Sequence, residues 1–62
     1  MKKYSVQYSI SAPSDEHSYR EWITVDVKPM QSVFEAVLNV LTRNGFMWIG
    51  QYLTIHNTIE ET

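Results

Sequence analysis

The sequence predicts a small α+β domain with the element order strand, strand, helix, strand. Two stretches near the N-terminus alternate apolar and polar residues, and a third alternating stretch lies near the C-terminus. Between them, apolar residues recur at helical spacing, after a capping serine and before a glycine. A right-handed crossover through the helix leaves room for the first strand in the middle, so we expect a three-stranded antiparallel sheet in the order 2-1-3, with one helix packed on one face.

The first two strands are predicted over residues 3–11 (KYSVQYSIS) and 20–27 (REWITVDV). β-Branched and aromatic residues recurring with a period of two are typical of a strand that is buried on one side. In the second stretch, Trp22, Thr24 and Asp26 share the side opposite the aliphatic residues. Each strand therefore has one apolar side and one largely polar side.

A helix is predicted over residues 33–44. Ser32 and Glu35 have the spacing of a capping box, in which the serine side chain accepts a hydrogen bond from the third helical amide. Gly45 suits the left-handed conformation that commonly follows a helix. Phe46 then occupies the position that packs back on the last turn in a Schellman motif. Both ends of the helix are thus indicated by the sequence.

The last strand is predicted over about residues 51–58, with residues 46–50 (FMWIG) as an extended lead-in or a short strand of their own. Gly50 indicates a bulge or bend rather than a tight turn, because no Asn-Gly or Asp-Gly pair is present. Strict alternation assigns the residues of this strand to two sides: Tyr52, Thr54, His56 and Thr58 on one, and Leu53, Ile55 and Asn57 on the other.

Residues 1–62 are expected to form a single domain. Residues 11–19 (SAPSDEHSY) lack an apolar period and predict a loop long enough to be mobile, and residues 60–62 are expected to fray. The chain has no cysteine and is close to the lower size limit for a core without metal, disulfide or partner. We therefore expect an isolated copy to be only marginally stable.

The predicted sheet has one face covered by the helix and one open face. The residues expected in the core are Tyr4, Val6, Tyr8, Ile10, Ile23, Val25, Val27, Val33, Phe34, Val37, Leu38, Leu41, Ile49, Leu53 and Ile55. Polar residues are expected on the open side of an antiparallel sheet, but tryptophan and tyrosine are not. We expect the open face to be the interface with a partner or a second copy, formed by Trp22, Thr24, Trp48, Tyr52, Thr54 and His56. Trp48 could instead cap the core where the helix joins the sheet.

The charge of the chain argues against nucleic acid as a partner. Five Lys and Arg residues face seven Asp and Glu residues, giving a net charge of -2. Phosphate binding needs a basic surface, and Lys2, Lys3, Arg20 and Lys28 lie near acidic neighbours at the expected sheet ends. A single-stranded nucleic-acid-binding module that stacks bases on the aromatic face is the less favoured alternative.

No pattern of catalytic, cofactor-binding or metal-binding residues is present. The chain has no cysteine nucleophile, and its serines have no neighbouring His and Asp to activate them. Its two glycines do not form a phosphate-binding loop. Asp15, Glu16 and His17 are adjacent in a predicted loop, where side chains rarely converge on one metal, with only His56 as a second imidazole. We therefore expect a protein that is not an enzyme and has no cofactor.

The sequence thus predicts a small accessory or regulatory protein that binds protein, with a homodimer through the aromatic open face as the favoured arrangement and a host protein as an alternative or additional partner. Tyr, Trp, Phe and Met, which are frequent here, are enriched in interface cores. Small size and the lack of catalytic residues suggest a phage or mobile-element protein. No apolar run approaches the roughly 18 residues needed to span a bilayer, so we expect a cytoplasmic location and no membrane contact.

Overall fold

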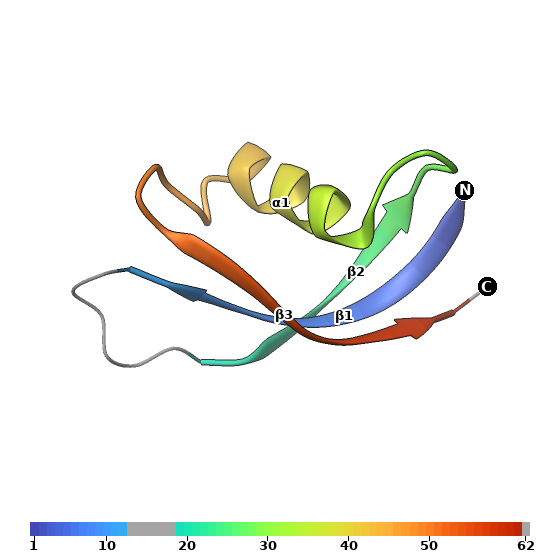
Figure 1. Ribbon diagram of the computed structural model, residues 1–62, viewed down its shortest axis with the longest axis horizontal. Coiled ribbons are helices and arrows are strands. Elements are labelled where there is room, and N and C mark those ends of the chain that lie inside the picture. Colours follow the sequence, from blue (N-terminus) through green and yellow to red (C-terminus); the bar gives the residue numbers. More distant parts are fainter. Residues whose placement is uncertain (13–18, 62) are drawn as a thin grey trace.

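The computed structural model describes residues 1–12 and 19–61, which form three strands and one helix. In chain order these are β1 (Lys2–Ser11), β2 (Glu21–Val27), α1 (Val33–Arg43) and β3 (Tyr52–Glu60). The strands form one antiparallel sheet in the order β2-β1-β3, and α1 lies across one face of it (Figure 1). The predicted fold class and strand order are confirmed. Most of the predicted loop over 11–19 lies outside the described residues.

Strand β1 is central and sorts the side chains onto two faces. Opposite β2, Gln7 pairs with Trp22, whereas the neighbouring Val6 pairs with Ile23. Because successive residues of a strand point to opposite faces, Val6 and Ile23 face the helix and Gln7 and Trp22 face away from it. The predicted side assignments of these residues are confirmed, since Val6 is fully buried and Ile23 packs against the core.

Strand β3 contains a β-bulge at His56. Gln7 of β1 lies opposite Asn57, but the next residue, Tyr8, lies opposite Ile55. His56 therefore has no partner of its own in β1 and is the extra residue of the bulge. Because of this one extra residue, every residue beyond the bulge lies on the opposite face of the sheet from the face that strict alternation would give it.

The bulge corrects the predicted side assignment of the C-terminal half of β3. Asn57 lies opposite Gln7 and Ile59 lies opposite Ser5, so both belong to the open face. Thr58, between them, belongs to the helix side. The predicted sides of Asn57 and Thr58 are therefore wrong, because the alternation that holds before His56 is inverted after it. The strand also continues to Glu60, two residues further than predicted.

Both ends of α1 are stabilised as the sequence predicts. The Ser32 side chain accepts a hydrogen bond from the Glu35 amide at 3.1 Å. At the other end, the amides of Phe46 and Gly45 donate to carbonyls of the last turn at 2.9 and 3.2 Å, which is the hydrogen-bond pattern of a Schellman motif. Gly45 has a φ of 76°, in the left-handed region. The helix therefore ends at a fixed point and directs the following loop toward β3.

A tight turn joins that loop to β3. The Gln51 amide donates to the Trp48 carbonyl at 3.2 Å, and the Gln51 side-chain oxygen accepts from the Trp48 amide at 2.7 Å. Gly50, in the third position of this turn, has a φ of 94°, as a type II turn requires. The expectation that Gly50 marks a bulge rather than a tight turn is therefore wrong. The bulge of this segment is at His56 instead.

The core lies between α1 and the sheet. Its buried apolar residues are Val6, Tyr8, Val25, Val27, Ala36, Val37 and Leu41. Two residues expected in the core are exposed: Ile49 is at the second position of the turn, and Phe34 is 46% exposed. Successive residues of an α-helix are rotated by about 100° around its axis. Because Ala36 is buried together with Val37 and Leu41, the buried stripe of the helix is centred away from Phe34, which lies at its margin.

The buried Tyr8 is expected to make the fold sensitive to alkaline pH. Burial raises the pKa of its phenol above 10.0, and the nearby Glu21 carboxylate, 3.4 Å from the hydroxyl, raises it further. The folded state therefore favours the neutral phenol, so this contribution to the free energy of unfolding is present below pH 10 and is lost as the pH rises through the folded-state pKa. Denaturant titrations at pH values below and above 10 should show that the free energy of unfolding falls less for Tyr8→Phe than for the parent. Tyr19→Phe, at an exposed position, is the control; equal losses in all three proteins would contradict this assignment.

Candidate protein-binding face

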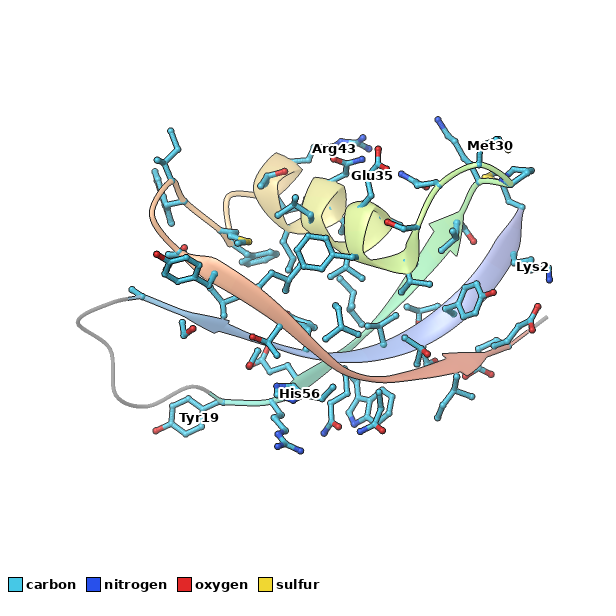
Figure 2. The ribbon with its side chains drawn as sticks, in the orientation of Figure 1. Lys2, Tyr19, Met30, Glu35, Arg43 and His56 are labelled. Carbon is cyan, nitrogen blue, oxygen red and sulfur yellow. The ribbon has the colours of Figure 1, made fainter. Side chains whose placement is uncertain are left out.

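The open face is the side of the sheet opposite α1 (Figure 1). The strand registers assign to it Lys3, Ser5, Gln7, Ser9 and Ser11 from β1, Trp22, Thr24 and Asp26 from β2, and Tyr52, Thr54, His56, Asn57 and Ile59 from β3. Figure 2 shows His56 on the side of the sheet that faces away from the helix. Five of the six predicted interface residues therefore lie on one continuous surface.

Polar side chains in the middle of the open face are bonded to one another across β1 and β3. The Asn57 amide nitrogen donates to the Gln7 side-chain oxygen at 2.6 Å. The Ser9 hydroxyl and His56 Nε2 are 2.8 Å apart. The bulge makes both contacts possible, because it brings the consecutive residues His56 and Asn57 onto the same face.

A third contact of this kind lies at the end of the same row. The Ser5 hydroxyl donates to a Glu61 carboxylate oxygen at 2.7 Å. We call the three contacts the cross-strand polar pairs: Ser5–Glu61, Gln7–Asn57 and Ser9–His56. Ser9 is almost completely buried, and no buried side-chain nitrogen or oxygen among the described residues lacks a hydrogen-bond partner. The polar side chains in the middle of the open face are therefore bonded to one another within the chain.

Three large apolar side chains flank the cross-strand polar pairs. Trp22 on β2 is 53% exposed, and Tyr52 and Ile59 on β3 are 62% and 52% exposed. Trp22 lies opposite Gln7 and Ile59 lies opposite Ser5, so apolar residues from both outer strands border the polar row on β1. The open face therefore carries large exposed apolar side chains on both sides of its polar row.

Within the paired strands, formal charges on the open face lie only toward one end; the exposed Arg20 directly precedes β2 at the other end. Lys3 and Asp26 are opposite each other in β1 and β2, and Glu61 follows the end of β3. Among the described residues of this face, the row from Gln7 to Ser11 and its neighbours carry no Asp, Glu, Lys or Arg. An approaching partner therefore meets a centre without Asp, Glu, Lys or Arg side chains.

Trp48 is the predicted interface residue that the structure places elsewhere. It lies in the turn before β3, takes no part in sheet pairing, and its side chain is 72% exposed. The alternative that Trp48 caps the core is therefore wrong. Together with the exposed Phe46 and Ile49, Trp48 forms an apolar loop held by the Schellman motif at one end and the tight turn at the other.

Two residues of the open face were not predicted, Asn57 and Ile59. Both were missed because no turn residue marks the bulge at His56, so strict alternation placed Asn57 on the wrong side and ended the strand before Ile59. An isoleucine one residue past the predicted strand end was the available signal for a longer strand. Thr24 and Thr54 are exposed and His56 is half-buried, as their positions on this face imply.

The described residues contain no group of three His, Cys, Asp or Glu side chains that could hold a metal ion, and the Asp15–His17 segment lies outside them. No helix in the described part of the chain is long and apolar enough to cross a membrane.

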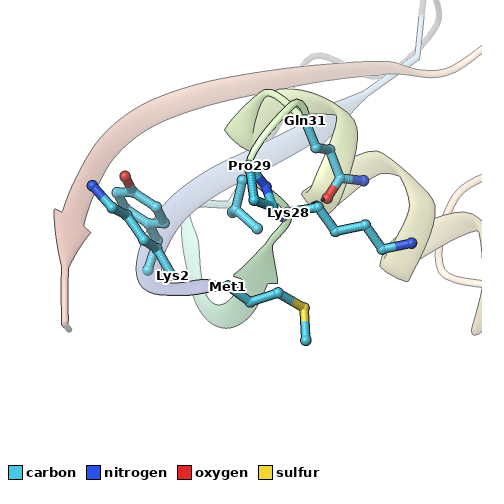
Figure 3. A pocket seen from close by; sticks show the side chains of 7 residues that line it. Met1, Lys2, Lys28, Pro29 and Gln31 are labelled. Atoms are coloured by element: carbon cyan, nitrogen blue, oxygen red, sulfur yellow. Dashed lines mark hydrogen bonds between the residues drawn. The ribbon is translucent and has the colours of Figure 1, made fainter.

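A cleft of about 450 Å³ lies where β1 begins and β2 ends (Figure 3); its lining residues are Met1, Lys2, Tyr4, Val27, Lys28, Pro29 and Gln31. It is separate from the cross-strand polar pairs.

No protein-family model, curated protein or solved structure matches this chain.

Proposed function

We propose that this chain is a non-enzymatic protein-binding module and that the open face is its recognition surface. The cross-strand polar pairs are the observation that carries the proposal. A polar group that is covered without a hydrogen-bond partner costs about 1–3 kcal/mol. Because the side chains of Gln7 and Ser9 already bond those of Asn57 and His56, another protein can exclude water from the middle of this face with fewer polar groups left unpaired.

The flanking apolar residues supply the favourable part of the binding energy. Tryptophan and tyrosine dominate binding at many interfaces because they bury a large area and lose little conformational freedom. Trp22, Tyr52 and Ile59 are each more than half exposed in the free chain, so each has apolar area left to bury. They lie on both outer strands, and a partner that contacts all three must cover the cross-strand polar pairs between them.

The charges favour a protein over single-stranded nucleic acid. Of the cations near the sheet, Lys2 forms an ion pair with Glu60 at 3.2 Å, and Lys3 lies opposite Asp26. A strand of nucleic acid that stacked on Trp22 would need cations along its phosphates, and the centre of the open face has no lysine or arginine. An accessory or regulatory role follows from such a surface on a chain with no proposed chemistry of its own.

Site-specific photo-crosslinking in the native cell tests this proposal. A photoreactive residue in place of Thr24, on the open face, should form a covalent adduct with a specific protein. The same residue in place of Asn39, on the exposed side of α1, should not. Adding Trp22→Ala and Tyr52→Ala should lower the adduct yield about tenfold or more, because truncating a central aromatic typically costs over 1 kcal/mol of binding.

Circular dichroism of each variant establishes that the fold is intact. Adducts of equal yield from positions 24 and 39 would contradict a specific face. In a Trp48→Phe background, the fluorescence of Trp22 should not respond to single-stranded oligonucleotides. A salt-sensitive quenching of Trp22 would favour the nucleic-acid alternative instead.

A further inference from the structure

We propose that two copies of this chain pair in antiparallel fashion along the outer edge of β3, centred on Ile59, so that two three-stranded sheets join into one six-stranded sheet. The partner is a second copy of the chain and the contact is the strand edge. The contact uses the backbone edge of β3 rather than the part of the open face that carries Trp22 and Tyr52, although Ile59 belongs to both.

The backbone shows which groups the edge of β3 offers. The Glu61 amide donates to the Lys3 carbonyl at 2.7 Å, so at this position β3 directs its hydrogen bonds toward β1. In an antiparallel ladder this direction alternates along the strand, and the register is regular from here back to Asn57. Ile59 therefore also points its amide toward β1, whereas Thr58 and Glu60 point theirs outward, where no strand of the described part of the chain pairs with them.

This edge lacks the residues that usually prevent pairing. Natural edge strands carry lysine, proline or several charges, contain a β-bulge, or are very short. β3 has nine residues (YLTIHNTIE), and its single formal charge, on Glu60, is paired with Lys2. The bulge at His56 interrupts the edge, so the regular segment beyond it, 57–60, is the part that can accept another strand.

A two-fold axis at Ile59 gives a self-complementary register. Thr58 then lies opposite Glu60 of the second copy, and these two residues exchange the outward hydrogen bonds that each offers. Ile59, which is 52% exposed, contacts its own counterpart across the axis on the open-face side. Asn57 lies opposite Glu61 of the second copy. No two like charges are directly opposed in this register, and an exposed apolar side chain becomes buried.

The other edge of the sheet is protected, so the assembly should stop at two copies. β2 carries two exposed acidic residues, Glu21 and Asp26, within seven residues. Helix α1 packs beside this strand, and a cleft of about 380 Å³ is lined by both β2 and helix residues such as Asn39 and Arg43. Pairing along β3 alone produces a closed two-fold dimer rather than a fibre.

Proline substitutions that differ by one residue test the proposal. Thr58→Pro removes an outward amide and leaves the ladder to β1 intact, because edge positions tolerate proline when the amide faces outward. We expect it to fold and to weaken self-association at least about tenfold, measured by analytical ultracentrifugation. Thr58→Ala keeps the amide and should associate like the parent. Ile59→Pro removes an amide bonded to β1 and should lower the thermal midpoint of the monomer.

Two further measurements cover the case in which Thr58→Pro does not fold. Amide hydrogen exchange of the parent should slow at Thr58 and Glu60 as protein concentration rises. Ile59→Lys, at an exposed position, opposes two like charges at the axis and should give a monomer. A parent chain that is monomeric at high concentration, or unchanged exchange at both amides, overturns the proposal. Loss of the dimer in Trp22→Ala, with the fold intact, would place the second copy on the open face and also overturn it.

Discussion

Leu41→Ala is expected to lower the free energy of unfolding by about 3 kcal/mol, within the range of about 2 to 5 kcal/mol measured for buried leucines. Leu41 is fully buried and is the largest side chain in the core with no exposed area. Its removal leaves a cavity between α1 and the sheet that a core this small cannot refill from another layer. A domain of this length has a total stability of only about 3 to 9 kcal/mol, so this single change should remove a third or more of it.

Denaturant unfolding followed by circular dichroism measures this loss, and Phe34→Ala is the matched control on the same helix. Phenylalanine is larger than leucine, yet Phe34 is nearly half exposed, so its truncation should cost clearly less. Leu41→Met, which keeps most of the volume, should fold and cost under about 1.5 kcal/mol. Equal losses for Leu41→Ala and Phe34→Ala would show that the helix packs through a different stripe than the one described.

Deletion of His56 is expected to be tolerated, whereas deletion of Thr54, two residues earlier, should unfold the domain. A deletion within a strand normally moves every side chain before or after the deleted position to the opposite face of the sheet. His56 is the extra residue of the bulge, so its removal leaves Ile55 opposite Tyr8 and Asn57 opposite Gln7 in a regular ladder. The expected cost is about 1 to 3 kcal/mol, because Ser9 is buried and loses its partner.

Closing the bulge cannot accommodate the deletion of Thr54 in the same way. If the bulge remains, Leu53 moves from the helix side to the open face; if the bulge closes, His56 moves toward the core. Thermal unfolding of the two deletion variants compares them directly, and Ser9→Ala in the His56-deleted chain should restore part of the loss. A His56-deleted chain that is as unstable as the Thr54-deleted chain would contradict the bulge.

The elements themselves were predictable because their signals are local. Each predicted element is present, with bounds within two residues of those expected. Ser32 and Gly45 act through hydrogen bonds within a few residues of themselves, so the ends of α1 can be read without knowledge of the rest of the chain. The same holds for the sides of β1 and β2, where alternation is uninterrupted along the paired residues.

The candidate interface was predictable only where the register is regular. Trp22 and Thr24 were assigned correctly through β2, and Tyr52 and Thr54 through the part of β3 before the bulge. Trp48 was assigned as though it continued the strand. A turn closed by its contact with Gln51 places it outside the sheet instead.

The sequence by itself determined the order and type of the elements, the ends of the helix, and the apolar sides of the first two strands, because each depends on neighbours in the chain. Only the tertiary structure decided the C-terminal half of the open face. The bulge at His56 depends on how β3 registers against β1, including the Ser9–His56 and Gln7–Asn57 contacts, which join residues about fifty positions apart. A one-residue difference in register decides whether Ile59 faces the helix or the open face, and no pattern within β3 specifies it.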